Sequence, residues 1–196
     1  MHLSLTTVAA LLLVTAASGA PAGFHPHDAC ADARSSSLEL NQVARNAFIT
    51  ARNGSKDVTD FSTSLAWMES RDMCDPEALK RDSATCVGKI LDVLASYKSA
   101  VERVAVFASC AARVRDVEPA IQRLQQDIST CVKSRGGNAY EKHNSIEEIR
   151  SIPGWQEVLL CQYTMDRLFS FSILTARVFA VGDPSNHTGG SAHRCM

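Results

Sequence analysis

Apolar residues recur at helical spacing in four long segments, and this periodicity is the strongest constraint on the fold. In the first segment the residues at steps of three and four are Leu40, Ala44, Ala47 and Phe48. They predict a helix over residues 29–52. No segment alternates apolar and polar residues between hairpin turns. The sequence therefore predicts an all-α chain.

The second helix is predicted to begin after Asp75-Pro76, a pair suited to an N-cap and a first turn, and to run to about residue 113. Its apolar positions are Val87, Ile90, Leu94, Tyr97, Val101, Val104 and Ala108. The third helix carries Val117, Ile121, Leu124, Ile128 and Cys131 on one stripe. We expect Pro119 in its first turn and its end before Gly136. The last helix is predicted from Trp155 to Val181.

The lengths of the connections predict the topology. The first and third connections are long and the second is short. Long connections are needed where two successive helices run in the same direction, whereas a short one joins antiparallel neighbours. The pattern predicts a long-chain four-helix bundle with up-up-down-down topology. We expect the bundle domain to span residues 20–184 and to be followed by a flexible tail, 185–196. In the first connection we expect Phe61, Leu65 and Trp67 to pack down.

Residues 1–19 have the pattern of a secretory signal peptide. An uncharged apolar run is followed by small residues, with Ala17 and Gly19 placed for cleavage before Ala20. The run is too short to span a bilayer comfortably, and no later segment reaches membrane length. We expect a secreted, extracellular protein that does not insert into membranes. The motifs Asn53-Gly54-Ser55 and Asn186-His187-Thr188 are candidate glycosylation sites at the surface, on Asn53 and Asn186.

Cysteine usage fits export, because all seven cysteines follow the predicted cleavage point. The bundle topology places Cys110 and Cys161 towards one end and Cys30, Cys131 and Cys195 at the other. We therefore expect a Cys110–Cys161 bridge, one pair among the other three, and a local Cys74–Cys86 bridge. An odd number leaves one cysteine as a free thiol or for a bond to another chain.

The last helix is apolar on two faces. The face predicted to enter the core carries Met165, Leu168, Phe171, Ser172, Thr175 and Phe179. The opposite face carries Leu159, Tyr163, Asp166, Ser170, Ile173, Leu174, Arg177 and Val181. From Leu168 to Val181 the only charged residue is Arg177. This second face needs a cover, either a partner protein with acceptors opposite Arg177, or a long loop beside which Arg177 reaches water.

The sequence contains no pattern of catalysis or of nucleic-acid binding. A net charge of -1 without runs of like charge excludes an electrostatic surface for nucleic acid. Phosphate loops, nucleophile elbows and metal-binding His or Cys motifs are absent. His25 and His27 are interpreted as solvated loop residues, and Glu147 and Glu148 as a solvated surface pair. We expect no enzyme activity, no cofactor and no metal, and we retain a secreted carrier of a hydrophobic ligand as an alternative class.

Three stretches resemble the interleukin-23 alpha type of subunit in the interleukin-12 family of helical cytokines. The first runs from Cys74 to Cys86 (CDPEALKRDSATC) and is followed by a matching Tyr97-Lys98 region. The others are the two ends of the last helix, GWQEVLL at 154–160 and ARVFAVG at 176–182. The interleukin-12 alpha subunit is the nearest sibling type, and an interleukin-12 alpha-like subunit is the alternative within this family.

The resemblance implies a cytokine bundle that acts as half of a heterodimer. Such a subunit pairs with an interleukin-12 beta-type subunit, and the heterodimer signals in immunity and inflammation through the interleukin-23 receptor and the interleukin-12 receptor beta-1 chain. Arg177 matches the arginine that enters an acidic pocket of the beta subunit. We therefore expect Ser170, Ile173, Leu174 and Val181 beside it in that interface.

Two further residues take roles from the resemblance, and one position departs from it. Trp155 matches a tryptophan contacted by the receptor; without the resemblance it would be interpreted as a cap over the core. Cys74 and Cys86 match an intrachain bridge. Ser70 stands where the family has its interchain cysteine. The heterodimer is thus either non-covalent or linked through another cysteine, with Cys30, Cys131 and Cys195 as candidates.

Overall fold

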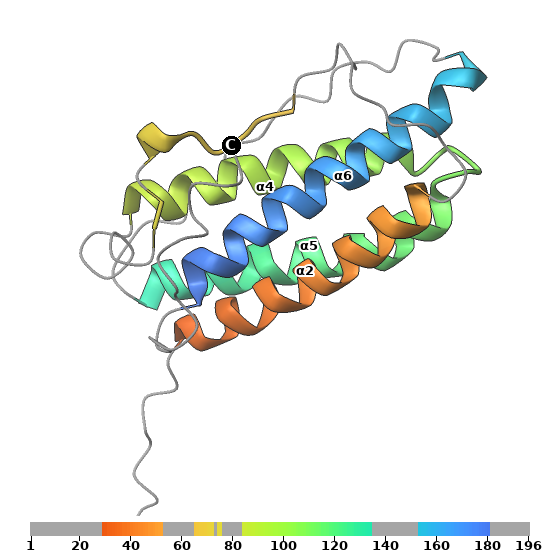
Figure 1. Ribbon diagram of the computed structural model, residues 1–196. Coiled ribbons are helices and arrows are strands. Elements are labelled where there is room, and N and C mark those ends of the chain that lie inside the picture. Colours follow the sequence, from red (N-terminus) through yellow and green to blue (C-terminus); the bar gives the residue numbers. More distant parts are fainter. Residues whose placement is uncertain (1–28, 53–64, 73, 76–83, 135–152, 181–196) are drawn as a thin grey trace, which may run out of the picture.

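The computed structural model describes residues 29–52, 65–72, 74–75, 84–134 and 153–180. Their elements are α2 (Ala29–Arg52), the short 3₁₀ helix η1 (Ser70–Asp72), α4 (Ala84–Val104), α5 (Ala111–Ser134) and α6 (Gly154–Phe179). These residues contain four α-helices and no strand. The predicted all-α four-helix bundle is confirmed (Figure 1).

The four helices pack as the corners of a square. Helix α2 contacts α5 and α6, and α4 contacts the same two helices, so α5 and α6 occupy opposite corners. Figure 1 shows α2 and α4 running in one direction and α5 and α6 in the other. The connections that join α2 to α4 and α5 to α6 lie largely outside the described residues.

The predicted apolar stripes form the core. The large side chains with almost no exposure include Leu40, Ile90, Leu94, Tyr97, Ile121, Leu124, Ile128, Met165, Leu168 and Phe171. Tyr97 of α4 stacks on Phe171 of α6, with 5.1 Å between ring centroids. Because every helix contributes its stripe to one cluster, burial of apolar surface holds the bundle together.

The predicted boundary between the second and third helices was wrong. Helix α4 ends at Val104, and the chain turns over residues 105–110 before α5 begins at Ala111. Phe107 and Cys110 enter the core, whereas Ala108, expected on the buried stripe, is exposed. The Phe107 N–H donates to the Val104 carbonyl over 3.1 Å, which closes the turn. A continuous helix through these residues could not reverse the chain between α4 and α5, which run in opposite directions.

Because α5 begins earlier than predicted, Pro119 lies further along the helix than expected. It lies inside the helix and not in the first turn. Proline has no N–H, so one hydrogen bond to the carbonyl four residues earlier is missing there. Pro119 is exposed, where water can reach the freed carbonyl, and α5 continues to Ser134 as expected.

Three disulfides connect the elements. Cys30–Cys131 joins the start of α2 to the end of α5, and Cys110–Cys161 joins the α4–α5 turn to α6. Cys74–Cys86 joins the segment before α4 to α4 itself. Six of the seven cysteines are therefore paired within the chain. The seventh, Cys195, lies outside the described residues.

Several predictions fall on parts of the chain that the structure does not describe. These are the signal peptide 1–19, the tail 185–196, Asn53, Asn186, Val181, Phe61, His25, His27, Glu147 and Glu148. Within the described residues, none of the helices is long and apolar enough to cross a membrane.

Candidate partner-binding surface

The face of α6 that lies inside the bundle is the face predicted from the sequence to enter the core. Met165, Leu168, Phe171, Ser172, Thr175 and Phe179 are all buried. The two hydroxyl groups among them are satisfied within the helix: Thr175 donates to the Phe171 carbonyl over 2.8 Å and Ser172 to the Phe169 carbonyl over 2.7 Å. Asn41 of α2 donates to the Ser172 hydroxyl over 3.1 Å, which ties α2 to α6. These hydrogen bonds offset the cost of burying the two hydroxyl groups.

The outer face of α6 is only partly covered. Ser170, Ile173 and Leu174 are half-buried, and Arg177, one turn further along, is exposed. Among the described residues, no carboxylate forms an ion pair with the Arg177 side chain. The structure thus brings together four of the five residues predicted to bind the beta-type subunit, and the fifth, Val181, lies outside the described residues.

One edge of this face is covered by the chain itself. Residues 65–72, here called the strap, cross beside α4 and α6, with Met68 buried and Leu65 and Trp67 half-buried against the core. The prediction that Leu65 and Trp67 pack down is confirmed. The guanidinium carbon of Arg167 lies 4.2 Å from the centroid of the Trp67 ring, a cation–π distance.

Burial shifts the pKa of two groups near this edge. Desolvation raises the pKa of Tyr97 well above its usual range, and the charge of Arg167 opposes part of that rise. Among the described residues the Tyr97 hydroxyl forms no hydrogen bond of ordinary geometry, but Arg167 is close enough to lower the pKa of Tyr97 through its charge and, to a smaller extent, through side-chain hydrogen bonding. Desolvation also raises the pKa of Asp166, against the charges of Arg167 and Arg52.

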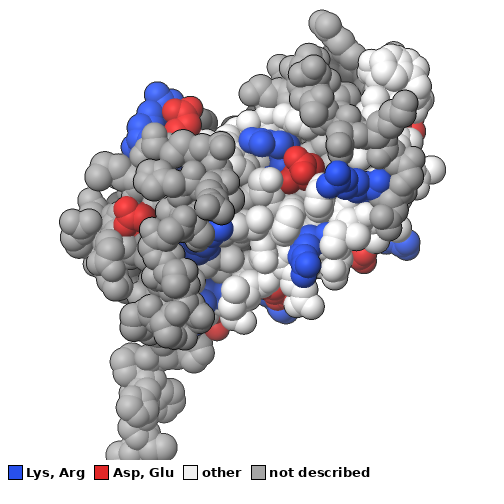
Figure 2. Space-filling view, in the orientation of Figure 1, with Lys and Arg blue, Asp and Glu red and all other residues white. Residues whose placement is uncertain are grey.

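Figure 2 views the bundle from the side on which α6 and α2 lie, and much of the described surface there is uncharged, with separated basic and acidic groups across it. Phe48 of α2 and Phe169 of α6 stack at 5.4 Å, and both are half-buried. Leu38 of α2 is 52% exposed. Sequence reasoning placed Phe48 in the core and overlooked Leu38. Only the packing of α2 beside α6 brings Phe48 next to Phe169.

A second exposed apolar group lies at the start of α6. Trp155 is 69% exposed and Val158, one turn later, is 46% exposed. Trp155 therefore does not cap the core. Its position on α6 is 22 residues from Arg177, which corresponds to about 33 Å along the helix axis. Val106, in the α4–α5 turn near the same end of the bundle, is 71% exposed and was not singled out by the sequence.

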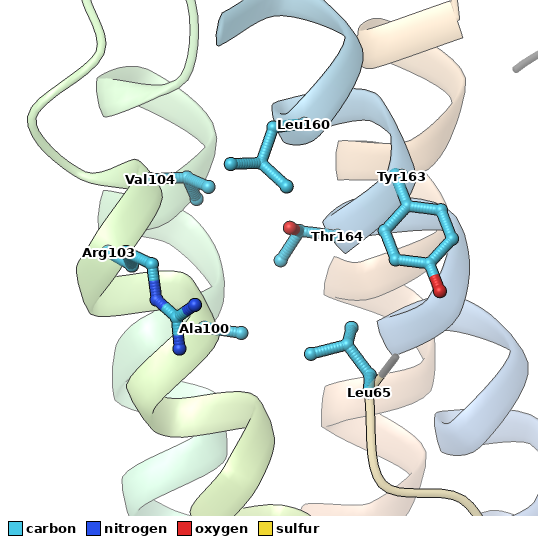
Figure 3. A pocket seen from close by; sticks show the side chains of 7 residues that line it. All are labelled: Leu65, Ala100, Arg103, Val104, Leu160, Tyr163 and Thr164. Atoms are coloured by element: carbon cyan, nitrogen blue, oxygen red, sulfur yellow. The ribbon is translucent and has the colours of Figure 1, made fainter. Parts of the chain in front are cut away.

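The cavity between α4, α6 and the strap is small. It is lined by Leu65, Ala100, Arg103, Val104, Leu160, Tyr163 and Thr164 (Figure 3). Its empty volume is about 240 Å³ even when the part open to solvent is counted, below the range of roughly 300–1,000 Å³ that ligand pockets occupy. The Tyr163 hydroxyl points away from it. In the described part of the chain, no cluster of His, Cys, Asp or Glu could hold a metal.

These features define a disulfide-bridged, all-α four-helix bundle whose last helix has an incompletely covered outer face. Comparisons with protein-family models, curated proteins and solved structures give no match to this chain.

Proposed function

We propose that this chain is a secreted, glycosylated helical cytokine subunit that pairs with an interleukin-12 beta-type subunit. The interleukin-23-like heterodimer then engages the interleukin-23 receptor and the interleukin-12 receptor beta-1 chain in immune and inflammatory signalling. The observation that carries the proposal is the exposed Arg177 within the partly covered outer face of α6. The resemblance of three stretches of sequence to this class of subunit gives the partner.

Arg177 has the properties of an interface anchor. It projects from the half-buried surface of Ser170, Ile173 and Leu174, and its side chain is free of intrachain ion pairs among the described residues. A planar guanidinium can make paired hydrogen bonds to carboxylates once a partner removes water from it. The apolar rim around it supports such desolvation.

Trp155 supports a second contact on the same helix. A large, rigid and exposed aromatic side chain is a frequent hot spot of binding. The separation of about 33 Å from Arg177 leaves room for two partners at once. Trp155 is therefore proposed to contact the receptor while Arg177 contacts the beta-type subunit.

The three disulfides fit a protein that folds in an oxidising compartment. Together with the leader-like residues 1–19 they support secretion. The pattern Asn-X-Ser/Thr at Asn53 and Asn186 supports glycosylation on the same route.

Co-expression with an interleukin-12 beta subunit tests the proposal. We expect co-secretion of a complex, and Arg177→Ala to weaken association by at least about 30-fold, the equivalent of an interface hot spot of about 2 kcal/mol. Arg115→Ala is the matched control, because Arg115 is an exposed arginine of α5 at the opposite corner of the bundle. Secretion of a lone chain that does not bind the beta subunit would contradict the proposal.

Trp155→Ala separates the two surfaces. We expect this variant to form the heterodimer as well as the wild type and to lose receptor binding, measured with immobilised receptor ectodomain. Loss of heterodimer formation as well would assign Trp155 to the bundle and contradict its receptor role.

A further inference from the structure

The strap is fastened to α4. The Cys74–Cys86 bridge follows it directly, η1 packs on α4, and Met68 is only 5% exposed. Two hydrogen bonds close the turn within the strap. The Asp72 N–H donates to the Glu69 carbonyl over 3.0 Å, and the Glu69 N–H donates to Asp72 Oδ2 over 2.6 Å. The strap is therefore a structured element with a fixed anchor on α4.

One pair of side chains joins the strap to α6. Arg167 of α6 is half-buried beneath the Trp67 ring and is close enough to Tyr97 of α4 to affect its pKa. Within the described ranges the Arg167 guanidinium forms no ion pair, and it lies against the Trp67 ring and near the Tyr97 hydroxyl. Arg167 thereby joins the strap, α4 and α6 at a single point.

The seam between α4 and α6 is incomplete without the strap. Ala100 and Val104 face Leu160 and Thr164 across an open space, and Leu65 of the strap closes one side of it (Figure 3). Because α4 and α6 leave this gap between them, the strap is held in place by the contacts of its own side chains. Leu65 lies beside α6 there, and Trp67 on Arg167 is a second contact of the strap with α6.

We propose that Arg167 and Trp67 form a clamp that positions the strap as the α4-side edge of the α6 outer face. Both are positioning residues for the binding of the beta-type partner. Ser170 and Leu174 follow Arg167 by three and seven residues and so lie on the same side of α6. With the clamp formed, this edge is pre-organised, and with the clamp broken the partner must order the strap as it binds. This inference rests on the proposed function.

A double-mutant cycle tests the clamp in the full chain co-expressed with the beta-type subunit. The variants are Trp67→Ala, Arg167→Ala and both together, with association measured by biolayer interferometry and folding by thermal melts. We expect each single change to weaken association about tenfold and the double change to cost little more, because both remove the same contact. Losses that add, or single variants that bind as the wild type does, overturn the inference.

Two conservative variants separate positioning from general stability. Trp67→Phe keeps an aromatic face for the guanidinium, so we expect association within about threefold of the wild type. Arg167→Lys keeps the charge but not the planar stack, so an intermediate loss is expected. If Trp67→Phe and Trp67→Ala bind alike while their melting temperatures differ, the role is structural and the clamp is refuted.

The control is Arg123→Ala on α5, which breaks the exposed ion pair of Arg123 with Glu39 at 3.0 Å. It should leave association unchanged. The outcomes distinguish the two proposals. A wild-type chain that does not bind the beta-type subunit overturns both, and a wild-type complex insensitive to the clamp overturns this inference alone.

Discussion

At the scale of single residues, the surroundings of each charged side chain on α6 decide what it can do. Asp166 is partly desolvated, Arg167 lies under an aromatic ring, and Arg177 is exposed. The sequence singled out Arg177 because it is the one charge in an apolar run. It could not single out Arg167, because the ring that covers it is a hundred positions away in the chain.

Asp166 gives a prediction of pH dependence. Its pKa is raised by burial, so the folded state holds its proton more tightly than the unfolded state does. Ionisation therefore lowers stability as pH rises through the raised pKa, and this loss is absent below the pKa of the unfolded carboxyl, about 3.9. We expect Asp166→Asn to melt at a higher temperature than the wild type at pH 7, with the difference vanishing towards pH 3.

Melting curves between pH 3 and pH 8 check this expectation. Asp116→Asn on the exposed side of α5 serves as the control. A stabilisation by Asp166→Asn that stayed constant over the whole pH range would show that ionisation is not its cause.

At the scale of the element, α6 combines a face that holds the bundle with a face available to a partner. Leu168 has no exposure, and Leu168→Ala should cost about 2–5 kcal/mol of unfolding free energy through lost burial and a cavity. Ile173 is half-buried, so Ile173→Ala should cost about 1 kcal/mol or less but weaken partner association. Denaturant unfolding and a binding assay on both variants check this division of roles between the two faces of α6. The reverse pattern would show that the faces are misassigned.

The turn between α4 and α5 is the other element-scale result. Residues 105–113 carry alanine, arginine and apolar side chains that are compatible with a continuous helix, so periodicity extended α4 to 113. In the structure the chain turns there, with Phe107 and Cys110 packed inward and Cys110 bonded to Cys161. Propensity acts within a few residues, whereas that bond depends on a partner 51 positions away.

We expect the Cys110–Cys161 bridge to contribute more stability than Cys74–Cys86. The first closes a separation of 51 residues and the second of 12, which correspond to about 4 and about 3 kcal/mol by loop closure. Both sulfurs of the first bridge are also buried, so its removal leaves a cavity. Paired Cys→Ala variants compared by urea unfolding check the order. A larger loss for the Cys74–Cys86 pair would contradict it.

At the scale of the whole molecule, covalent bonds link all four helices without the two long connections. Cys30–Cys131 joins α2 to α5, the short turn joins α5 to α4, and Cys110–Cys161 joins that turn to α6. Of the three cysteines considered as substitutes for the missing link at Ser70, Cys30 and Cys131 are used by the first bridge. Cys195 is the one left for a bond to another chain.

The assignment of Cys30 and Cys131 to an intrachain bridge predicts how the heterodimer will run on a non-reducing gel. We expect the heterodimer to run as one band without reductant, and as two bands when Cys195→Ser is introduced, with co-purification retained. Two bands for the wild type mean a non-covalent complex. A single band that persists in Cys195→Ser means that one of the intrachain bridges has exchanged.

The sequence by itself determined the four helices, the buried stripe of each and the two-sided character of α6, because these depend on spacings within a few turns. The predicted bounds of the first helix, the end of the third and the start of the last agree with the structure within about two residues, the usual margin at frayed ends, whereas α4 is described only from Ala84 and its predicted start after Pro76 lies outside the described residues. Tertiary structure decided where the chain turns between α4 and α5, that Cys30 pairs with Cys131, and that Trp67 covers Arg167. These contacts join residues far apart in the chain, so packing selects them and no local pattern records them.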